Sequence, residues 1–280
     1  MIQRIRRYLK RERKIKQMTD EKMPFTEHLT ELRKRIIVSV AALLIGFIVC
    51  FSYSEEIFEV LILPLKSEMS FSMHYPFVSL VASKIKNPAL VFLAPAEAFW
   101  MHMKVSFAAG LVLSLPIILH QFWRFISPGL LLKEKKYIGP FVVSASLLFL
   151  VGALFCFLFV LPFAMSFLLT YKTGSMTPML SVGSYVDFCL KFILAFGAVF
   201  ELPIIIVLLT RMGIVTPKTL AKNRKYAILV AFIIAAILTP TPDAFNQTLM
   251  AVPIIVLYEA GILVSRLFVR KKTEDAQRQG

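Results

Sequence analysis

The stretch YIGPFVVSASLLFLVGALFCFLFVLPFAMSFLLTY occupies residues 137–171 and contains no charged side chain. An uncharged apolar segment of this length predicts a transmembrane helix. A continuous helix over it would measure about 50 Å, whereas the hydrocarbon core of a bilayer is about 30 Å thick. We therefore expect this helix to tilt, to break near Pro162 or to project beyond the bilayer.

Further apolar runs lie on both sides of this stretch and predict a polytopic membrane protein. The chain is 58% hydrophobic with a mean hydropathy of +0.72, well above the roughly 45–50% apolar content of soluble domains. We predict an all-α fold with six spans, at about 36–53, 98–122, 137–161, 188–209, 226–239 and 245–263. The fifth span is only about 21 Å long as a helix, so its hairpin should thin the bilayer or be shielded by partner helices.

Proline lies well inside three of these spans, at Pro116, Pro203 and Pro253. A proline inside a helix removes a backbone hydrogen bond and bends the helix, which predicts a curved, cup-like bundle. The alternative is that proline is simply commoner in membrane helices. In the loop between the first two spans, segments 55–65 and 72–85 are amphipathic and predict short helices that cap the outer face.

The basic residues predict the orientation of the spans. Lys and Arg number 26 on the side of both termini and six on the other side, and the ratio is still 18 to six without the distal residues 1–16. An excess of Lys and Arg marks the cytoplasmic side. We therefore expect both termini to be cytoplasmic.

Three regions follow from this organisation: a basic cytoplasmic tail at 1–22, a membrane domain at 23–268 and a cytoplasmic tail at 269–280. The start of the chain does not match a cleavable secretory signal, so we expect the first span to be retained. The distal tail either lies on anionic lipid as a basic helix or stays solvated.

Several function classes lack their sequence signatures. The net charge of +15 comes without any nucleic-acid-binding module, so we expect no nucleic-acid partner. Nucleotide-binding loops, nucleophile elbows and zinc-protease motifs are absent, so we expect no enzyme activity and no cofactor. The cysteines and histidines lack the spacing of metal ligands, so we also expect no metal.

Two acidic residues stand inside spans, Glu201 in the fourth and Glu259 near the cytoplasmic end of the sixth. A charge at the centre of a span costs roughly 2.5–3.5 kcal/mol on insertion scales. Glu201 is therefore expected to face a partner, a cavity or a neighbouring helix, and a functional role is favoured. Glu259 can extend toward the membrane surface, so a structural role is favoured there.

A second group of acids lies on the cytoplasmic side. Glu27 and Glu31 are one helical turn apart, and Glu134 is the only acid between the second and third spans. One interpretation is ordinary pairing on a helix surface. The other is a site for a cationic ligand, because carboxylates bind guanidinium groups bidentately.

Several motifs in order resemble one membrane-protein family. They are PFTEHLTELRKR at 24–35, LPL at 63–65, LSLPIILHQFWRFISPGLLLKEKKY at 113–137, FELP at 200–203 and LTPTPDAFNQTLMAVPIIVLYEAG at 238–261. Together they are similar to TatC, the multi-spanning subunit of the twin-arginine protein translocase. The resemblance implies a Sec-independent receptor for the Arg-Arg signal peptides of folded proteins. It also implies TatA-type and TatB-type single-span partners, contact with membrane lipids, a multimeric complex and export driven by the proton-motive force.

The resemblance further implies roles on the cytoplasmic surface. Glu31 and Glu134 would contact the arginines of the signal peptide, and Phe125 with its flanking loop would complete that surface. Arg33, Pro64 and Pro116 would shape it.

In the membrane, Glu201 corresponds to the family's acid near a partner-helix site, and Gln247 to the polar residue early in the last span. A competing hypothesis makes the chain a proton-coupled transporter of small molecules or ions, with Glu201 as a proton relay. That class favours repeated halves and more polar groups at mid-membrane, which this sequence lacks.

Overall fold

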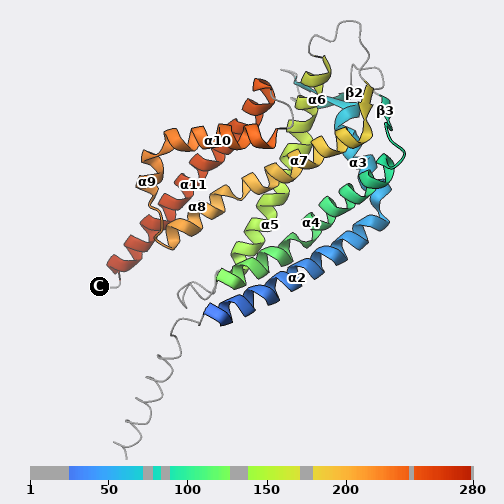
Figure 1. The fold of residues 1–280 in the computed structure, drawn as a ribbon. Helices are drawn as coiled ribbons and strands as arrows, with labels where there is room; N and C mark the ends of the chain where they lie inside the picture. Colours follow the sequence, from blue (N-terminus) through green and yellow to red (C-terminus); the bar gives the residue numbers. More distant parts are fainter. Residues whose placement is uncertain are drawn as a thin grey trace, which may run out of the picture.

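The computed structural model describes residues 25–71, 78–82, 89–126, 138–170, 179–239 and 243–278. The first two long helices, α2 (Phe25–Ser52) and α4 (Glu97–Ile126), lie side by side (Figure 1). A Cβ atom added at Gly46 would come within 2.7 Å of the carbonyl oxygen of Gly110. The two backbones therefore approach closely where both helices lack a side chain.

The long uncharged stretch forms one interrupted helix. It comprises α5 (Ile138–Phe155), a π-helical turn (Cys156–Val160) and α6 (Leu161–Thr170). Pro162 cannot donate a backbone hydrogen bond, and its ring would clash with the preceding turn of an α-helix. The wider π turn lies directly before this proline, as insertions in a helix ladder often do. The helix therefore changes its hydrogen-bonding pattern just before Pro162 and continues as one candidate span over Gly139–Leu169, so the sequence correctly predicts a local irregularity near Pro162 but not a full break.

The fourth span is also interrupted where the sequence predicts a bend. Helix α7 (Val182–Phe200) ends at a turn on Glu201, and α8 (Leu202–Arg211) begins with Pro203 in its first turn. Proline suits a first turn because the amide hydrogens there have no intrahelical partner. At the other end of α8, Gly213 has a φ of 74°, the left-handed conformation that commonly ends helices.

The last two apolar runs form a hairpin that follows the short helix α9 (Pro217–Lys222). Helix α10 (Arg224–Leu238) has 15 residues, and α11 (Ala244–Arg278) has 35. Five helices in the described residues are long and apolar enough to cross a membrane. Helix α10, about 22 Å long, is shorter than a bilayer core, so the count of six spans stays a prediction. Helix α11 continues past the predicted boundary at 268.

The loop after α2 contains the predicted helix at 55–65, seen as α3 (Ser54–Lys66). The second predicted helix, at 72–85, is wrong in its described part: β2 (Val78–Ala82) pairs antiparallel with β1 (Ser67–Phe71). Its valine-containing sequence VSLVA suits a strand, and a segment this short does not distinguish the two periodicities.

A second pair of strands joins two distant loops. Strand β3 (Ala89–Val91) runs parallel to β4 (Met179–Ser181). The strands lie with α3 and α6 at one end of the molecule, which we call the strand end. The start of α2 and the ends of α4, α8 and α11 lie toward the opposite end, which we call the terminal end (Figure 1).

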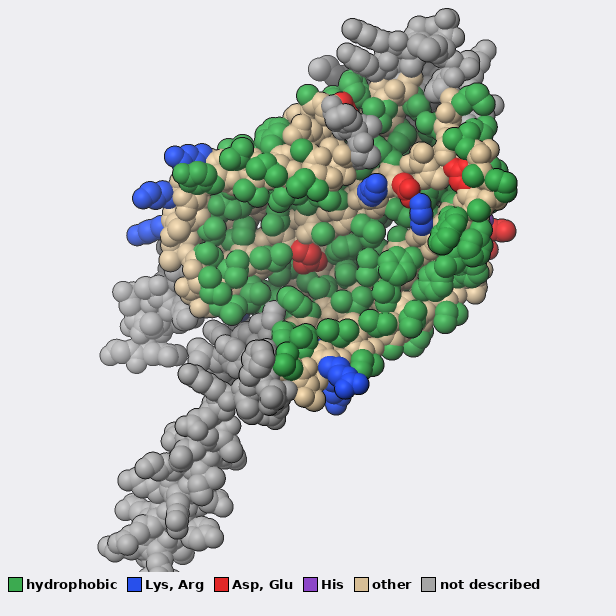
Figure 2. Space-filling model, viewed as in Figure 1, with side chains coloured by type: hydrophobic (Ala, Val, Ile, Leu, Met, Phe, Trp, Pro, Cys, Tyr) green, Lys and Arg blue, Asp and Glu red, His purple; other side chains and the backbone are tan. Residues whose placement is uncertain are grey.

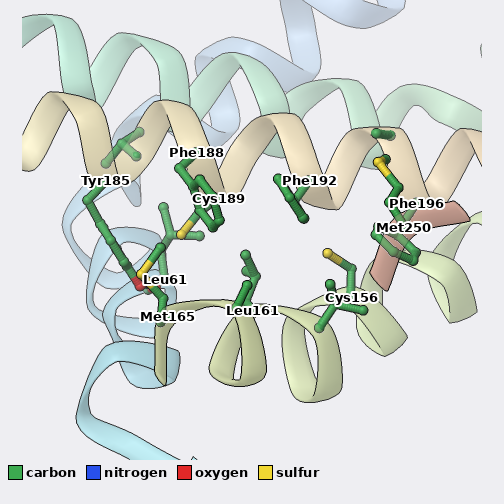
Figure 3. Close-up of a cluster of buried hydrophobic side chains, with 14 of the residues drawn as sticks. Leu61, Cys156, Leu161, Met165, Tyr185, Phe188, Cys189, Phe192, Phe196 and Met250 are labelled. Atoms are coloured by element: carbon green, nitrogen blue, oxygen red, sulfur yellow. The ribbon is translucent and has the colours of Figure 1, made fainter. Parts of the chain in front are cut away.

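The core lies between α7 and the interrupted third helix. Phe192 and Phe196 of α7 are fully buried and point toward Leu161 and Cys156, and Met250 of α11 is buried beside them (Figure 3). Stacking joins the rings of Phe188 and Phe192, whose centroids are 4.5 Å apart. Aromatic packing thus fixes α7 as the central helix.

The outer surface is apolar over most of the face in Figure 2. Among the exposed side chains of α2, Ile45 keeps 65% and Leu44 keeps 55% of its area uncovered. Soluble monomers rarely expose contiguous apolar patches of this kind. The helices therefore present a lipid-facing surface, as the apolar composition predicts.

Candidate functional site

Glu31 lies near the start of α2, at the terminal end, beside the end of α4. The guanidinium of Arg35 donates to Glu31 Oε1 over 2.8 Å and to the side-chain oxygen of Gln121 over 3.2 Å. Arg35 therefore holds the Glu31 carboxylate and ties α2 to α4.

One oxygen of the Glu31 carboxylate has no partner within the described part of the chain. Oε2 is buried and accepts no hydrogen bond there, while the whole side chain is 19% exposed. A carboxylate can accept about four hydrogen bonds across its two oxygens. The free acceptor capacity fits a further guanidinium, which binds carboxylates through parallel N–H donors.

The other residues predicted for the signal-peptide surface lie at different places in the structure. Phe125 is half-buried at the end of α4, on the helix that Arg35 joins to α2. Arg33 is exposed and forms no ion pair with the described residues. Pro116 lies inside α4, ten residues before its end. Pro64 lies inside α3, which is at the strand end. Glu134 lies outside the described residues.

Two residues of this site were missed by the sequence analysis. Arg35 follows Glu31 by four positions, a spacing that places both on one helix face and could have indicated the pair. Gln121 is 86 positions from Arg35 in sequence. No local signal predicts that contact, because it depends on how α2 and α4 pack.

Glu201 occupies the turn between α7 and α8. Its Oε1 is buried and has no hydrogen-bond partner among the described residues. An unpartnered carboxylate oxygen inside an apolar bundle is costly. This carboxylate therefore lacks the hydrogen bond to a neighbouring helix that a purely structural role would require of Oε1. A functional role for Glu201 stays a prediction.

The other polar groups of the hairpin have structural partners. Gln247 donates from Nε2 to the carbonyl oxygen of Phe232, over 3.1 Å, and so joins α11 to α10. Glu259 pairs with Arg224, with Nε to Oε1 at 2.6 Å and Nη2 to Oε2 at 2.8 Å. The structural role favoured for Glu259 is consistent with this bidentate pair. Within the part of the chain that the structure describes, Gln247 forms no hydrogen bond with Glu201.

The described residues contain no group of three or more His, Cys, Asp or Glu side chains placed to hold a metal ion. The features that distinguish this chain are instead a multi-helix membrane fold and two carboxylates with unused acceptor capacity.

Comparison with known proteins agrees with this description. A model of the family described as Sec-independent protein translocase protein (TatC) matches residues 27–253. A relative of that name from Aquifex aeolicus is 42% identical over 254 residues, which cover 90% of this chain and 98% of the relative. Another, from Desulforapulum autotrophicum, is 38% identical over 258 residues, covering 92% of this chain and 90% of the relative.

Two crystal structures titled as the twin arginine translocase receptor TatC also match, one of them in DDM. Both are 41% identical to this chain, with TM-scores of 0.71 and 0.72. They cover 86% and 85% of this chain, which spans 99% of each solved chain.

The fold and the apolar helices define a multi-pass membrane protein, and the relatives are protein-transport subunits. The chain belongs to the TatC family of Sec-independent protein translocase subunits. The comparisons support this function and not the small-molecule or ion transporter considered from the sequence.

Proposed function

We propose that this chain is the receptor that binds twin-arginine signal peptides of folded proteins on the cytoplasmic face. The observation that carries the proposal is the Glu31 carboxylate, which is held by Arg35 and keeps one buried oxygen without a partner among the described residues. The solved relatives are titled as twin arginine translocase receptors.

In the proposed site, one guanidinium of the signal peptide reaches the unpartnered Oε2 of Glu31, and the second binds Glu134. Arg35 is a positioning residue, because its bond to Gln121 fixes the carboxylate relative to α4. Phe125, at the end of α4, supplies an apolar side chain to the proposed signal-peptide surface. Lysine is a poor substitute for the signal arginines, since an ammonium lacks the planar fork of donors.

The membrane-embedded residues have a separate proposed role. Glu201 would bind a single-span TatA-type or TatB-type helix, because its buried oxygen lacks a partner in the described structure. Such a complex would use the proton-motive force. The asymmetry of basic residues supports a cytoplasmic location of both termini, and membership of the TatC family supports an inner-membrane location.

The test is binding of a fluorescent Arg-Arg signal peptide to the purified full chain in detergent. Glu31→Gln keeps an acceptor for Arg35 while it removes the charge, and Glu134→Gln does the same in the loop. Hydrogen bonds to charged groups contribute about 1.5–3 kcal/mol, so each variant should bind about tenfold to a hundredfold more weakly.

The matched control is Glu59→Gln, an exposed acid on α3 at the strand end, which should leave binding unchanged. A Lys-Lys peptide should bind the wild-type protein weakly. Equal binding of the Arg-Arg peptide to all four proteins would refute the proposed receptor site.

A further inference from the structure

A groove of about 530 Å³ lies between α2, α4 and α7. Its apolar lining includes Leu43, Leu44 and Phe47 of α2, Phe107 of α4 and Leu194 of α7. This groove is separate from Glu31 at the terminal end and from Glu201 at the turn after α7.

Three charged side chains line the same groove, although they belong to the apolar spans of α4 and α7. Lys104 Nζ contacts the two carboxylate oxygens of Asp187 at 2.7 and 2.9 Å. Lys191 lies one helical turn beyond Asp187 and is exposed, and it forms no ion pair with any residue that the structure describes. The groove therefore has two ammonium groups and one carboxylate.

The charges lie in the part of the bilayer nearest the strand end. Lys104 is about 10 Å along the axis from the start of α4, and Lys191 is about 13 Å from the start of α7. Lysine stems extend along apolar surfaces and carry the ammonium toward the membrane interface. The excess cation at this depth calls for an anion, because an unpaired charge inside a span is costly.

The size and lining of the groove favour a thin apolar occupant with an anionic head. A helix with its side chains is about 10–12 Å across, so a volume of 530 Å³ would hold little more than one helical turn. An extended hydrocarbon chain fills a narrower path along Leu44, Phe47 and Leu194. The charge and the shape thus point to the same kind of molecule.

We propose that this groove binds one anionic phospholipid of the leaflet nearest the strand end. Its phosphate binds Lys104 and Lys191, and one acyl chain lies along the apolar lining shared by α2, α4 and α7. Asp187 opposes the phosphate and competes for Lys104, so it sets an upper limit on the affinity. The lipid would bridge the seam between the α2–α4 pair and α7.

The test is native mass spectrometry of the purified, delipidated full chain titrated with dioleoyl phosphatidylglycerol. The double variant Lys104→Gln with Lys191→Gln should bind the first lipid at least about tenfold more weakly, because two charge-assisted contacts are lost. The matched control, Lys218→Gln with Lys222→Gln, removes the same charge from α9, which does not line the groove, and should bind like the wild type.

Two single variants distinguish a specific change in lipid binding from a loss of folding. Asp187→Asn should bind phosphatidylglycerol more tightly, a gain that misfolding cannot produce. Leu194→Trp should weaken binding with both lysines intact, because the indole fills the path of the acyl chain.

Three outcomes would overturn the proposal. The first is equal affinity of wild type and the groove double variant for the lipid. The second is equally tight binding of glycerol phosphate, which would make the site one for a free phosphate. The third is the finding that a copurified membrane protein, and not a lipid, protects Lys104 and Lys191 from chemical acylation.

Discussion

At the scale of single residues, Glu97 joins two segments that are far apart in sequence. Its Oε2 accepts the backbone N–H groups of Leu93 and Ala94, and its Oε1 accepts the N–H of Gly183 over 2.7 Å and the hydroxyl of Ser181. One carboxylate therefore holds the turn that leads into α4 and the start of α7 beside it. The parallel pair β3–β4 lies next to this junction.

We expect Glu97→Ala to lower the melting temperature of the detergent-solubilised protein, because several donors at the strand end lose one shared acceptor. Ser181→Ala should have a smaller effect, since it removes one of those bonds and the serine cap of α7. Differential scanning fluorimetry measures both. Glu59→Ala is the control, and a loss as large as that of Glu97→Ala would show that the junction is unimportant.

At the scale of elements, the contact between α2 and α4 depends on two facing glycines. A Cβ at Gly110 would lie 2.6 Å from the backbone nitrogen of Phe47, closer than real side chains approach. The same helix pair carries the Arg35 bonds to Glu31 and Gln121. Their spacing and register therefore determine the geometry of the proposed signal-peptide site.

Gly110→Val should destabilise the protein by about 1–3 kcal/mol, the usual cost of overpacking. It should also weaken binding of the Arg-Arg peptide, because α2 moves relative to Gln121. Unfolding in mixed micelles measures the first effect. Gly139→Ala is the matched control, since nothing lies within 4 Å of its added Cβ, and a wild-type stability for Gly110→Val would contradict the close contact.

At the scale of the whole molecule, the number of spans depends on whether α10 crosses the membrane. Its 15 residues are fewer than the usual 17–25 of a transmembrane helix. If α10 crosses, the chain has six spans and both termini lie on the same side. Without a crossing by α10 the chain would have five spans and the C-terminus would lie outside, whereas the structure places the end of α11 toward the same end as the start of α2 (Figure 1).

Cysteine labelling with a membrane-impermeant maleimide distinguishes these topologies. Lys84→Cys and Lys172→Cys should react in intact cells, whereas Lys135→Cys, Lys218→Cys and Gln279→Cys should react only after lysis. The native cysteines are buried and should give little background. Reaction of Gln279→Cys from outside would rule out six spans.

Much of the fold could be predicted because its determinants are local. The length of each apolar run indicates a span, and the interruptions at Pro162 and Glu201 follow from the missing amide hydrogen and the ring of a nearby proline. The strands were missed because segments of three to five residues carry too little periodicity. Of the site, Glu31 was singled out by the resemblance to TatC, because the acidic character that it shares with Glu27 in a basic segment left ordinary helix pairing open. Gln121 could not be predicted.

The sequence by itself determined that this is a multi-span helical membrane protein of the TatC family, since hydrophobicity, proline position and motif order are properties of consecutive residues. Only the tertiary structure decided which polar groups meet. Arg35 contacts Gln121, Lys104 contacts Asp187 and Glu97 contacts Gly183, each across more than 80 positions. Such partners are chosen by how helices pack, and packing depends on shape complementarity between surfaces that no single segment contains.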